Sequence, residues 1–225
     1  MLMDREFWRA RWEEGRIGFH QDNINPYLQR HWPALKAPPQ ATVFVPLCGK
    51  SRDMLWLRDR GHPVIGVELV PKAVAAFFEE NALPVDRRPH GPFTLWQGDG
   101  IRIYQGDFFD LAADELAAVG AVYDRASLIA LPPPLRRRYV AHLRTLLLTD
   151  VDILLVTMDY PQGEMEGPPF AVSEREVDAL YQDAFRIEPA CSEDILEANP
   201  RFREQGLSSL VERVYVLRAR ESSGG

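Results

Sequence analysis

The chain has 225 residues, a length that favours one sizeable α/β domain over two small ones. Its 46% of hydrophobic residues exclude global disorder, and its net charge of −7 argues against nucleic acid as the main partner. The charged start lacks the apolar core of a signal peptide, and the most apolar region is interrupted by charges that argue against a membrane span. Cys48 and Cys191 match no zinc pattern and are interpreted as free thiols. We therefore expect a cytoplasmic monomer that needs no metal, nucleic acid or membrane.

Strands and helices are expected to alternate along most of the chain. Two helices come first, at 5–14 and 26–35, followed by a breaker loop at 36–40. Strands are then expected at 42–46, 63–69, 93–97, 101–105, 121–124, 152–158, 185–188 and 209–219, and helices at 51–60, 71–81, 135–148 and 173–181. This alternation predicts a single domain with a mostly parallel sheet, helices on both faces and an antiparallel pair of strands at the C-terminal end.

Three local signals carry specific expectations. The Gly-Asp-Gly segment at 98–100 lies between two strand-like runs and predicts a hairpin. Ser173 and Glu176 have the spacing of a capping box at the start of a helix. Three consecutive arginines at 136–138 follow three prolines and are expected on the exposed face of a helix.

The first expected strand leads into a loop that ends in Gly-Lys-Ser at 49–51, like a phosphate-binding P-loop. A P-loop also needs a glycine five positions before this one, so that consecutive backbone N–H groups can surround phosphate oxygens. That position holds Phe44, which argues against a nucleotide phosphate site. Ligands of such sheets bind beyond the carboxyl ends of the strands, so residues 47–50 are still expected to lie at a ligand site.

Glu68 ends the second expected strand, nineteen positions after Gly49. A carboxylate in this place can accept hydrogen bonds from two vicinal ribose hydroxyls, as in dinucleotide-binding folds. A dinucleotide would also require a glycine-rich loop for its pyrophosphate, and this loop has a single glycine. A cofactor with a ribose and no phosphate fits better, and we expect S-adenosylmethionine. The alternative is a surface carboxylate that caps the next helix.

Two further segments follow strands and fit the same cofactor. Asp107 can accept a hydrogen bond from the adenine amino group, and Phe108 can flank the ring. The alternative for this segment is a turn with core aromatics. Arg125 would lie near the sulfonium and methionyl end, where its guanidinium can hold a carboxylate through two hydrogen bonds. The alternative for Asp124 and Arg125 is structural pairing with neighbouring groups.

Several segments together carry a family resemblance: 7–12, 17–21 (IGFHQ), 46–51 (PLCGKS), 53–54, 61–68 (GHPVIGVE), 124–125, 167–170 (GPPF) and 212–217 (ERVYVL). With these segments the chain resembles the thiopurine S-methyltransferase family, in its bacterial form, over nearly its whole length. The Pro-Leu-Cys-Gly-Lys loop, in place of a glycine-rich one, is the most specific of them. The resemblance identifies this loop as a methyltransferase cofactor loop.

The resemblance implies a Rossmann-like class I S-adenosylmethionine-dependent methyltransferase fold, with a mostly parallel seven-stranded sheet and an antiparallel C-terminal strand. Residues 41–219 would form the α/β core and residues 1–35 an N-terminal helical cover. The expected cofactor-binding residues are Trp12, Leu47, Gly49, Glu68, Asp107, Phe108 and Arg125. Phe19, His20 and Arg125 are expected at the acceptor, with His20 as a pocket residue rather than a base.

The activity implied by the resemblance is methyl transfer from S-adenosylmethionine to the sulfur of aromatic or heterocyclic thiols such as thiopurines, in xenobiotic or metalloid detoxification. The alternative acceptors are small thiols and selenium or tellurium species. Aromatic thiols ionise near neutral pH, so no catalytic residue is assigned and orientation, a dry pocket and charge placement would supply the rate. A nicotinamide-dependent reductase would need more loop glycines. A non-catalytic binding module would not need to keep a cofactor loop, Glu68 and Asp107.

Overall fold

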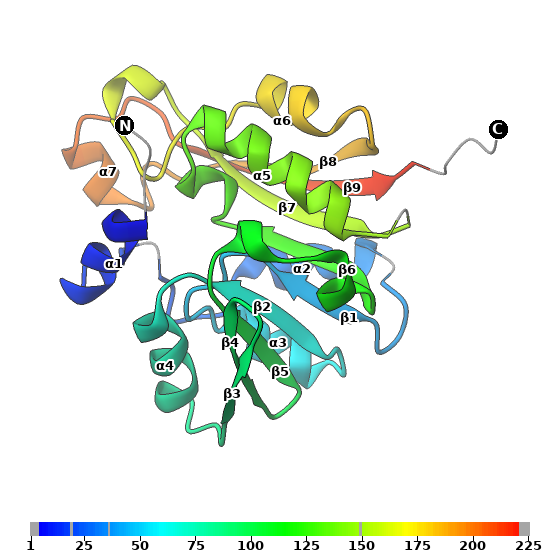
Figure 1. The fold of residues 1–225 in the computed structure, drawn as a ribbon. Coiled ribbons are helices and arrows are strands. Elements are labelled where there is room, and N and C mark those ends of the chain that lie inside the picture. The colour runs from blue at the N-terminus through cyan, green and yellow to red at the C-terminus, as the bar shows by residue number, and fades with distance from the viewer. Residues whose placement is uncertain (1–4, 19, 36, 149, 221–225) are drawn as a thin grey trace.

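The computed structural model describes residues 5–18, 20–35, 37–148 and 150–220. Within them, one sheet has the strand order β3-β4-β5-β2-β1-β6-β7-β9-β8 and runs from the bottom to the top of Figure 1. Its strands are β1 (Thr42–Val45), β2 (Val64–Glu68), β3 (Asp86–His90), β4 (Phe93–Gly98), β5 (Ile101–Gln105), β6 (Val119–Arg125), β7 (Asp152–Asp159), β8 (Phe185–Asp194) and β9 (Val211–Ala219).

The middle of the sheet is parallel. Strands β5, β2, β1, β6 and β7 pair in parallel, whereas β4 and β3 at one side and β9 and β8 at the other add antiparallel pairs. The predicted α/β architecture with antiparallel C-terminal strands is therefore confirmed. The sheet described has nine strands, however, where the resemblance implied seven and the sequence pattern predicted eight. Strand β3 escaped prediction because all five of its residues are exposed and it contains Pro89, which suits only an edge strand.

Helices cover both faces of the sheet. They are α1 (Arg5–Glu13), α2 (Pro26–His31), α3 (Asp53–Asp59), α4 (Pro71–Glu80), α5 (Pro133–Leu146), α6 (Glu174–Tyr181) and α7 (Pro200–Glu204). Successive side chains of a strand point to opposite faces. Accordingly, Phe44 packs into a core with Tyr139 of α5 and Tyr181 of α6, while its neighbours Val43 and Val45 pack into a second core with residues of α2, α3 and α4.

The local predictions had mixed outcomes. The hairpin between β4 and β5 is present, and its turn residues Asp99 and Gly100 have the positive φ angles that such turns require. Ser173 caps α6 by accepting from the Glu176 amide, but the Glu176 side chain does not complete a capping box because it binds Arg136. Arg136 itself is fully buried, so placing it on an exposed helix face was wrong. Helix α7 was not predicted.

No helix in the described ranges combines the length and the apolar character that crossing a membrane requires.

Candidate functional site

A cavity of about 1290 Å³ lies over the carboxyl ends of the parallel strands. All but one of the residues predicted for the site line this cavity: Trp12, His20, Leu47, Gly49, Glu68, Asp107, Phe108 and Arg125. Phe19 lies outside the described residues. The parallel sheet brings the others together because the ends of its neighbouring strands meet at one edge. Within the described residues, no group of three or more His, Cys, Asp or Glu side chains is placed to hold a metal ion.

The loop after β1 turns sharply at the cavity. Leu47 has a φ of 45° and Gly49 a φ of 53°, the left-handed region that few residues other than glycine adopt. The Cys48 amide donates to the Val67 carbonyl at 3.0 Å, which fixes the loop against β2. Cys48 is buried, and a Cβ on Gly66 would lie 2.7 Å from its Sγ, so position 66 must be glycine. Burial and the nearby Glu68 raise the pKa of the Cys48 thiol well above its usual value, which makes it a poor nucleophile.

Glu68 is a buried carboxylate at the end of β2. Its Oε2 accepts from the Gly49 amide at 2.9 Å, and its Oε1 accepts from the Val70 amide at 2.8 Å. Burial raises its pKa to about 6, although these backbone hydrogen bonds act in the opposite direction. The alternative of a surface carboxylate is therefore wrong, even though Glu68 does bind the amide just before α4. A carboxylate has about four acceptor positions, so both oxygens can still accept from a ligand.

Helix α1 lies across the loop after β1. Trp12 is 5% exposed, and its ring lies 3.4 Å from where a Cβ on Gly49 would stand. The same ring packs in a small apolar cluster with Val70 and Ala73 at the start of α4. At the N-terminal end of α1, Arg5 forms an ion pair of 2.8 Å with Asp107. The helix is thus attached to three of the strand-end segments that line the cavity.

Asp107 and Phe108 begin a short turn after β5. Asp107 accepts from the Phe109 amide at 2.9 Å, while its other oxygen binds Arg5. Phe108 is 3% exposed and packs against Tyr139 with ring centroids 4.8 Å apart. The alternative of a turn with core aromatics therefore describes this segment correctly, and the same two residues also border the cavity.

Arg125 extends from the end of β6 into a group of charges that the sequence did not reveal. Its Nη1 lies 3.9 Å from Oδ2 of Asp53, a carboxylate that is 2% exposed. Asp53 also accepts from the Asn25 amide at 2.8 Å and from the Tyr123 hydroxyl at 3.0 Å. Asp53 therefore joins the N-terminal segment to β6, and it attracts the Arg125 guanidinium electrostatically without a close hydrogen bond. In the sequence, Asp53 stood out only within the segment 53–54 of the family resemblance, and its place in the first turn of α3 gave no sign of these contacts.

Asp124 does not line the cavity. It is fully buried and accepts from the Tyr139 hydroxyl at 2.7 Å. Burial raises its pKa to about 6. The structural alternative thus applies to Asp124, which pairs with α5, whereas Arg125 lines the cavity.

The remaining walls come from segments far apart in the sequence. The Nε2 of His20 lies 3.4 Å from Oδ1 of Asp22. Burial, together with the nearby Lys50, lowers the pKa of His20, so its ring is neutral near pH 7. Arg201 on α7 donates to the Gly18 carbonyl at 2.7 Å, which joins α7 to the segment after α1 (Figure 1). An apolar part of the cavity is formed by Ile129, Leu131, Met158, Met165, Pro168, Pro169, Ile195 and Phe202. The Asn-Pro pair at 199–200 is a helix-start signal, so it could have predicted α7 and, with it, the position of Arg201.

Comparisons with known proteins agree over nearly the whole chain. A family model described as thiopurine S-methyltransferase matches residues 3–220. The thiopurine S-methyltransferase of Nitrosospira multiformis is 53% identical over 218 residues, covering 97% of this chain and 99% of that protein. That of Pseudomonas fluorescens is 49% identical over 216 residues, covering 96% and 99%. A solved Burkholderia thailandensis 1,6-didemethyltoxoflavin-N1-methyltransferase, with bound 1,6-didemethyltoxoflavin and S-adenosylhomocysteine, has a TM-score of 0.62 at 19% identity and covers 96% of this chain and 87% of its own. At that identity the likeness shows a shared fold.

Proposed function

The chain belongs to the thiopurine S-methyltransferase family, and from this premise we propose that it transfers the methyl group of S-adenosylmethionine to the sulfur of an aromatic or heterocyclic thiol. Its fold is that of class I S-adenosylmethionine-dependent methyltransferases. The observation that carries the proposal is the order of side chains along the cavity. Groups suited to a ribose, an adenine and a carboxylate stand at the ends of β2, β5 and β6 in turn.

The cofactor half of the cavity follows from that order. Glu68 would accept from both ribose hydroxyls, since each of its oxygens has accepting capacity left. Asp107 and Phe108 would contact the adenine, and Arg125 the methionyl carboxylate. The main chain from Leu47 to Gly49 would lie beneath the cofactor and contact it. Trp12, whose ring lies next to Gly49, would be a further cofactor contact.

The acceptor would occupy the apolar part of the cavity, with His20 and Arg125 beside it. The acceptor sulfur, as a thiolate, attacks the methyl carbon while the carbon–sulfur bond of the sulfonium breaks, giving a methyl thioether and S-adenosylhomocysteine. The chain's own groups fit a mechanism without a general base, because burial lowers the pKa of His20 and so weakens it as a base, and burial raises the pKa of the Cys48 thiol. Orientation within a cavity shielded from water then supplies the rate.

An aromatic acceptor is favoured over a small or inorganic one by the shape of this wall. Two methionines, two prolines and a phenylalanine line it, namely Met158, Met165, Pro168, Pro169 and Phe202. Such flat or polarisable side chains suit a planar ring, whereas these five wall residues offer no charged group to a selenium or tellurium oxyanion. We also propose a single domain, with residues 1–35 as a cover over the 41–219 core. This enzyme would act as a cytoplasmic monomer on a small thiol, without nucleic acid or membrane.

A methylation screen tests the proposal. The protein is incubated with labelled S-adenosylmethionine and an aromatic thiol, an aliphatic thiol or selenite, and the methylated products are quantified. We expect the highest kcat/KM with the aromatic thiol. Preference for the aliphatic thiol or selenite would overturn the acceptor assignment, and no transfer to any acceptor would overturn the activity.

A further inference from the structure

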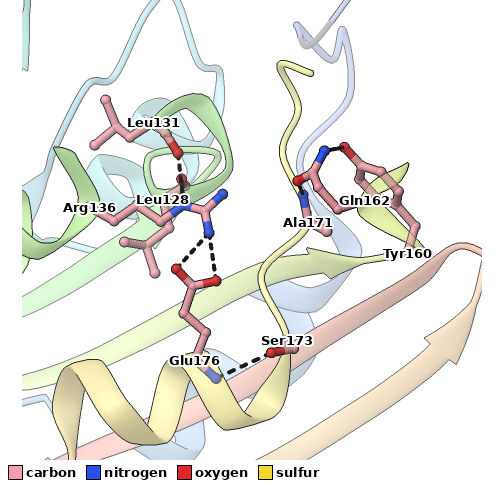
Figure 2. A network of polar contacts seen from close by, with 8 residues as sticks. All are labelled: Leu128, Leu131, Arg136, Tyr160, Gln162, Ala171, Ser173 and Glu176. Carbon is pink, nitrogen blue, oxygen red and sulfur yellow. Dashed lines mark hydrogen bonds and ion pairs between the residues drawn. The ribbon is translucent and has the colours of Figure 1, made fainter. Parts of the chain in front are cut away.

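Arg136 is a fully buried cation whose bonds connect two separate segments of the acceptor wall. Its Nε donates to the carbonyls of Leu128 at 3.0 Å and Leu131 at 2.8 Å, which flank the wall residues 129–130. Its Nη1 lies 2.7 Å from both carboxylate oxygens of Glu176 on α6. Figure 2 shows the guanidinium between the two carbonyls on one side and Glu176 on the other.

The chain that leads into α6 supplies the other half of this wall. Residues 165–169 contribute Met165, Pro168 and Pro169 to the cavity. The Phe170 amide that follows them donates to the Ile129 carbonyl at 2.7 Å, so the two wall segments are also bonded directly to each other. Arg136 and Glu176 do not line the cavity themselves, but they fix the distance between two segments that do.

A second set of bonds shapes the loop before α6. Gln162 accepts from the Ala171 amide at 2.9 Å and donates to the Met165 carbonyl at 2.7 Å. It also donates to the hydroxyl of Tyr160, which in turn donates to the Pro169 carbonyl at 2.6 Å. These bonds, part of which are drawn in Figure 2, close the loop on itself. With its own shape fixed, the loop is held to α5 by the pair of Arg136 and Glu176, in addition to the apolar core that Val172 shares with Tyr139 of α5.

Burying the Arg136 cation is an expensive way to gain stability, because its charge loses its hydration, while the Glu176 side chain stays 27% exposed. Neither charge lines the cavity, and among the described residues Arg136 Nη2 has no hydrogen-bond partner. We infer that Arg136 and Glu176 are positioning residues for the methyl acceptor: their ion pair sets the width of the slot between residues 129–131 and 165–169, and thereby selects planar fused-ring thiols. This inference rests on the proposed function and adds the element that determines acceptor shape.

Two conservative variants test it. Glu176→Gln keeps the shape of the side chain and removes its charge, while Arg136→Lys keeps the charge and loses the planar fork that reaches both carbonyls and Glu176. The readouts are kcat/KM for a two-ring thiopurine, kcat/KM for a one-ring aromatic thiol, and the Kd of S-adenosylhomocysteine by calorimetry. We expect the two-ring value to fall about tenfold or more, since a misplacement of about 1 Å can cost up to ~100-fold. The one-ring value should fall less, and the Kd should stay unchanged.

The matched control is a second ion pair, at the start of β7. Arg218 binds Asp152 at 2.7 Å and the Leu35 carbonyl at 2.9 Å, and neither side chain lines the cavity. Asp152→Asn should lower the melting temperature while leaving the ratio of two-ring to one-ring kcat/KM unchanged. If Arg136→Lys does not fold, Glu176→Gln alone decides the question.

The results of these measurements distinguish failure of the positioning role from failure of the proposed methyltransferase activity. An unchanged ratio in Glu176→Gln, or a Kd for S-adenosylhomocysteine that weakens in the same proportion as kcat/KM, would overturn the positioning role while leaving the activity intact. A wild-type protein that methylates no aromatic thiol would overturn the proposed function and the inference with it.

Discussion

Gly49 and Glu68 are nineteen positions apart in the sequence, yet the Gly49 amide donates to the Glu68 carboxylate at 2.9 Å. This hydrogen bond joins the loop after β1 to the end of β2 at the floor of the cavity. The same carboxylate also accepts from Val70, so its orientation is fixed before any ligand arrives. A fixed carboxylate loses little conformational entropy on binding, which is why Glu68 is expected to contribute strongly to cofactor affinity.

Glu68→Ala should weaken S-adenosylhomocysteine binding by about 2–4 kcal/mol, the scale of losing charge-assisted hydrogen bonds to two hydroxyls. Titration calorimetry gives this difference directly. Glu79→Ala, an exposed change on the neighbouring helix α4, is the control and should bind as the wild type does. Wild-type affinity in Glu68→Ala would remove Glu68 from the cofactor site.

The ends of the parallel strands were the part of the site that the sequence predicted well. Apolar runs of strand length place Glu68 and Arg125 at strand ends, and the parallel arrangement then brings those ends together whatever the details of packing. The loop before Gly49 also carried its own signal, since a P-loop was ruled out by the bulky Phe44. The placement of these residues could be predicted because periodicity decides which of them reach the edge, whereas the activity was implied by the family resemblance.

The acceptor wall could not be predicted, because it depends on long-range pairing. Arg136 looks like part of a solvated basic cluster, and its burial is explained by its bonds to the Leu128 and Leu131 carbonyls and by its contact with Glu176, forty positions away. Asp53 likewise becomes part of the site through Asn25 and Tyr123, which no local pattern connects to it. Side chains whose role comes from partners distant in the sequence leave no periodic signal.

Asp124 should give the protein a measurable dependence of stability on pH. Burial raises its pKa from 3.8 to about 6, so between these values the folded protein keeps a proton that the unfolded chain has released. The free energy of unfolding therefore falls as pH rises from about 4 to about 6, by roughly 1.4 kcal/mol for each unit of pKa shift, and then levels off.

Replacing this carboxyl isolates its contribution. Asp124→Asn cannot ionise and still offers an oxygen to the Tyr139 hydroxyl, so its urea-unfolding free energy should decline less over that range. The difference between variant and wild type across pH 4–7 is the measurement, which cancels the other titrating groups. A constant difference would show that Asp124 has an ordinary pKa in the folded protein.

Helix α1 is expected to become more ordered when cofactor binds, because Trp12 lies over Gly49 and Arg5 binds Asp107 at the cavity. Hydrogen exchange of residues 5–18 should slow on adding S-adenosylhomocysteine, since closing the helix over a ligand raises its local opening free energy. Trp12→Ala should lose much of this protection, and because the cluster of Trp12, Val70 and Ala73 is separate from the two main cores, the rest of the protein should stay folded without ligand. Equal exchange with and without ligand would contradict a closing role.

The last prediction distinguishes a preformed thiolate from a thiol that a side chain deprotonates. If the acceptor reacts as its anion, kcat/KM should rise with pH according to the acceptor's own ionisation. A series of aromatic thiols of graded acidity should then shift the inflection in step, whereas an enzymic base would hold it at one pH for every acceptor. His20 is the titratable side chain to test, because it lines the cavity and burial lowers its pKa. We expect His20→Ala to keep the shape of every profile. An inflection that ignores acceptor acidity and disappears in His20→Ala would mean that His20 is the base and that the thiolate mechanism is wrong.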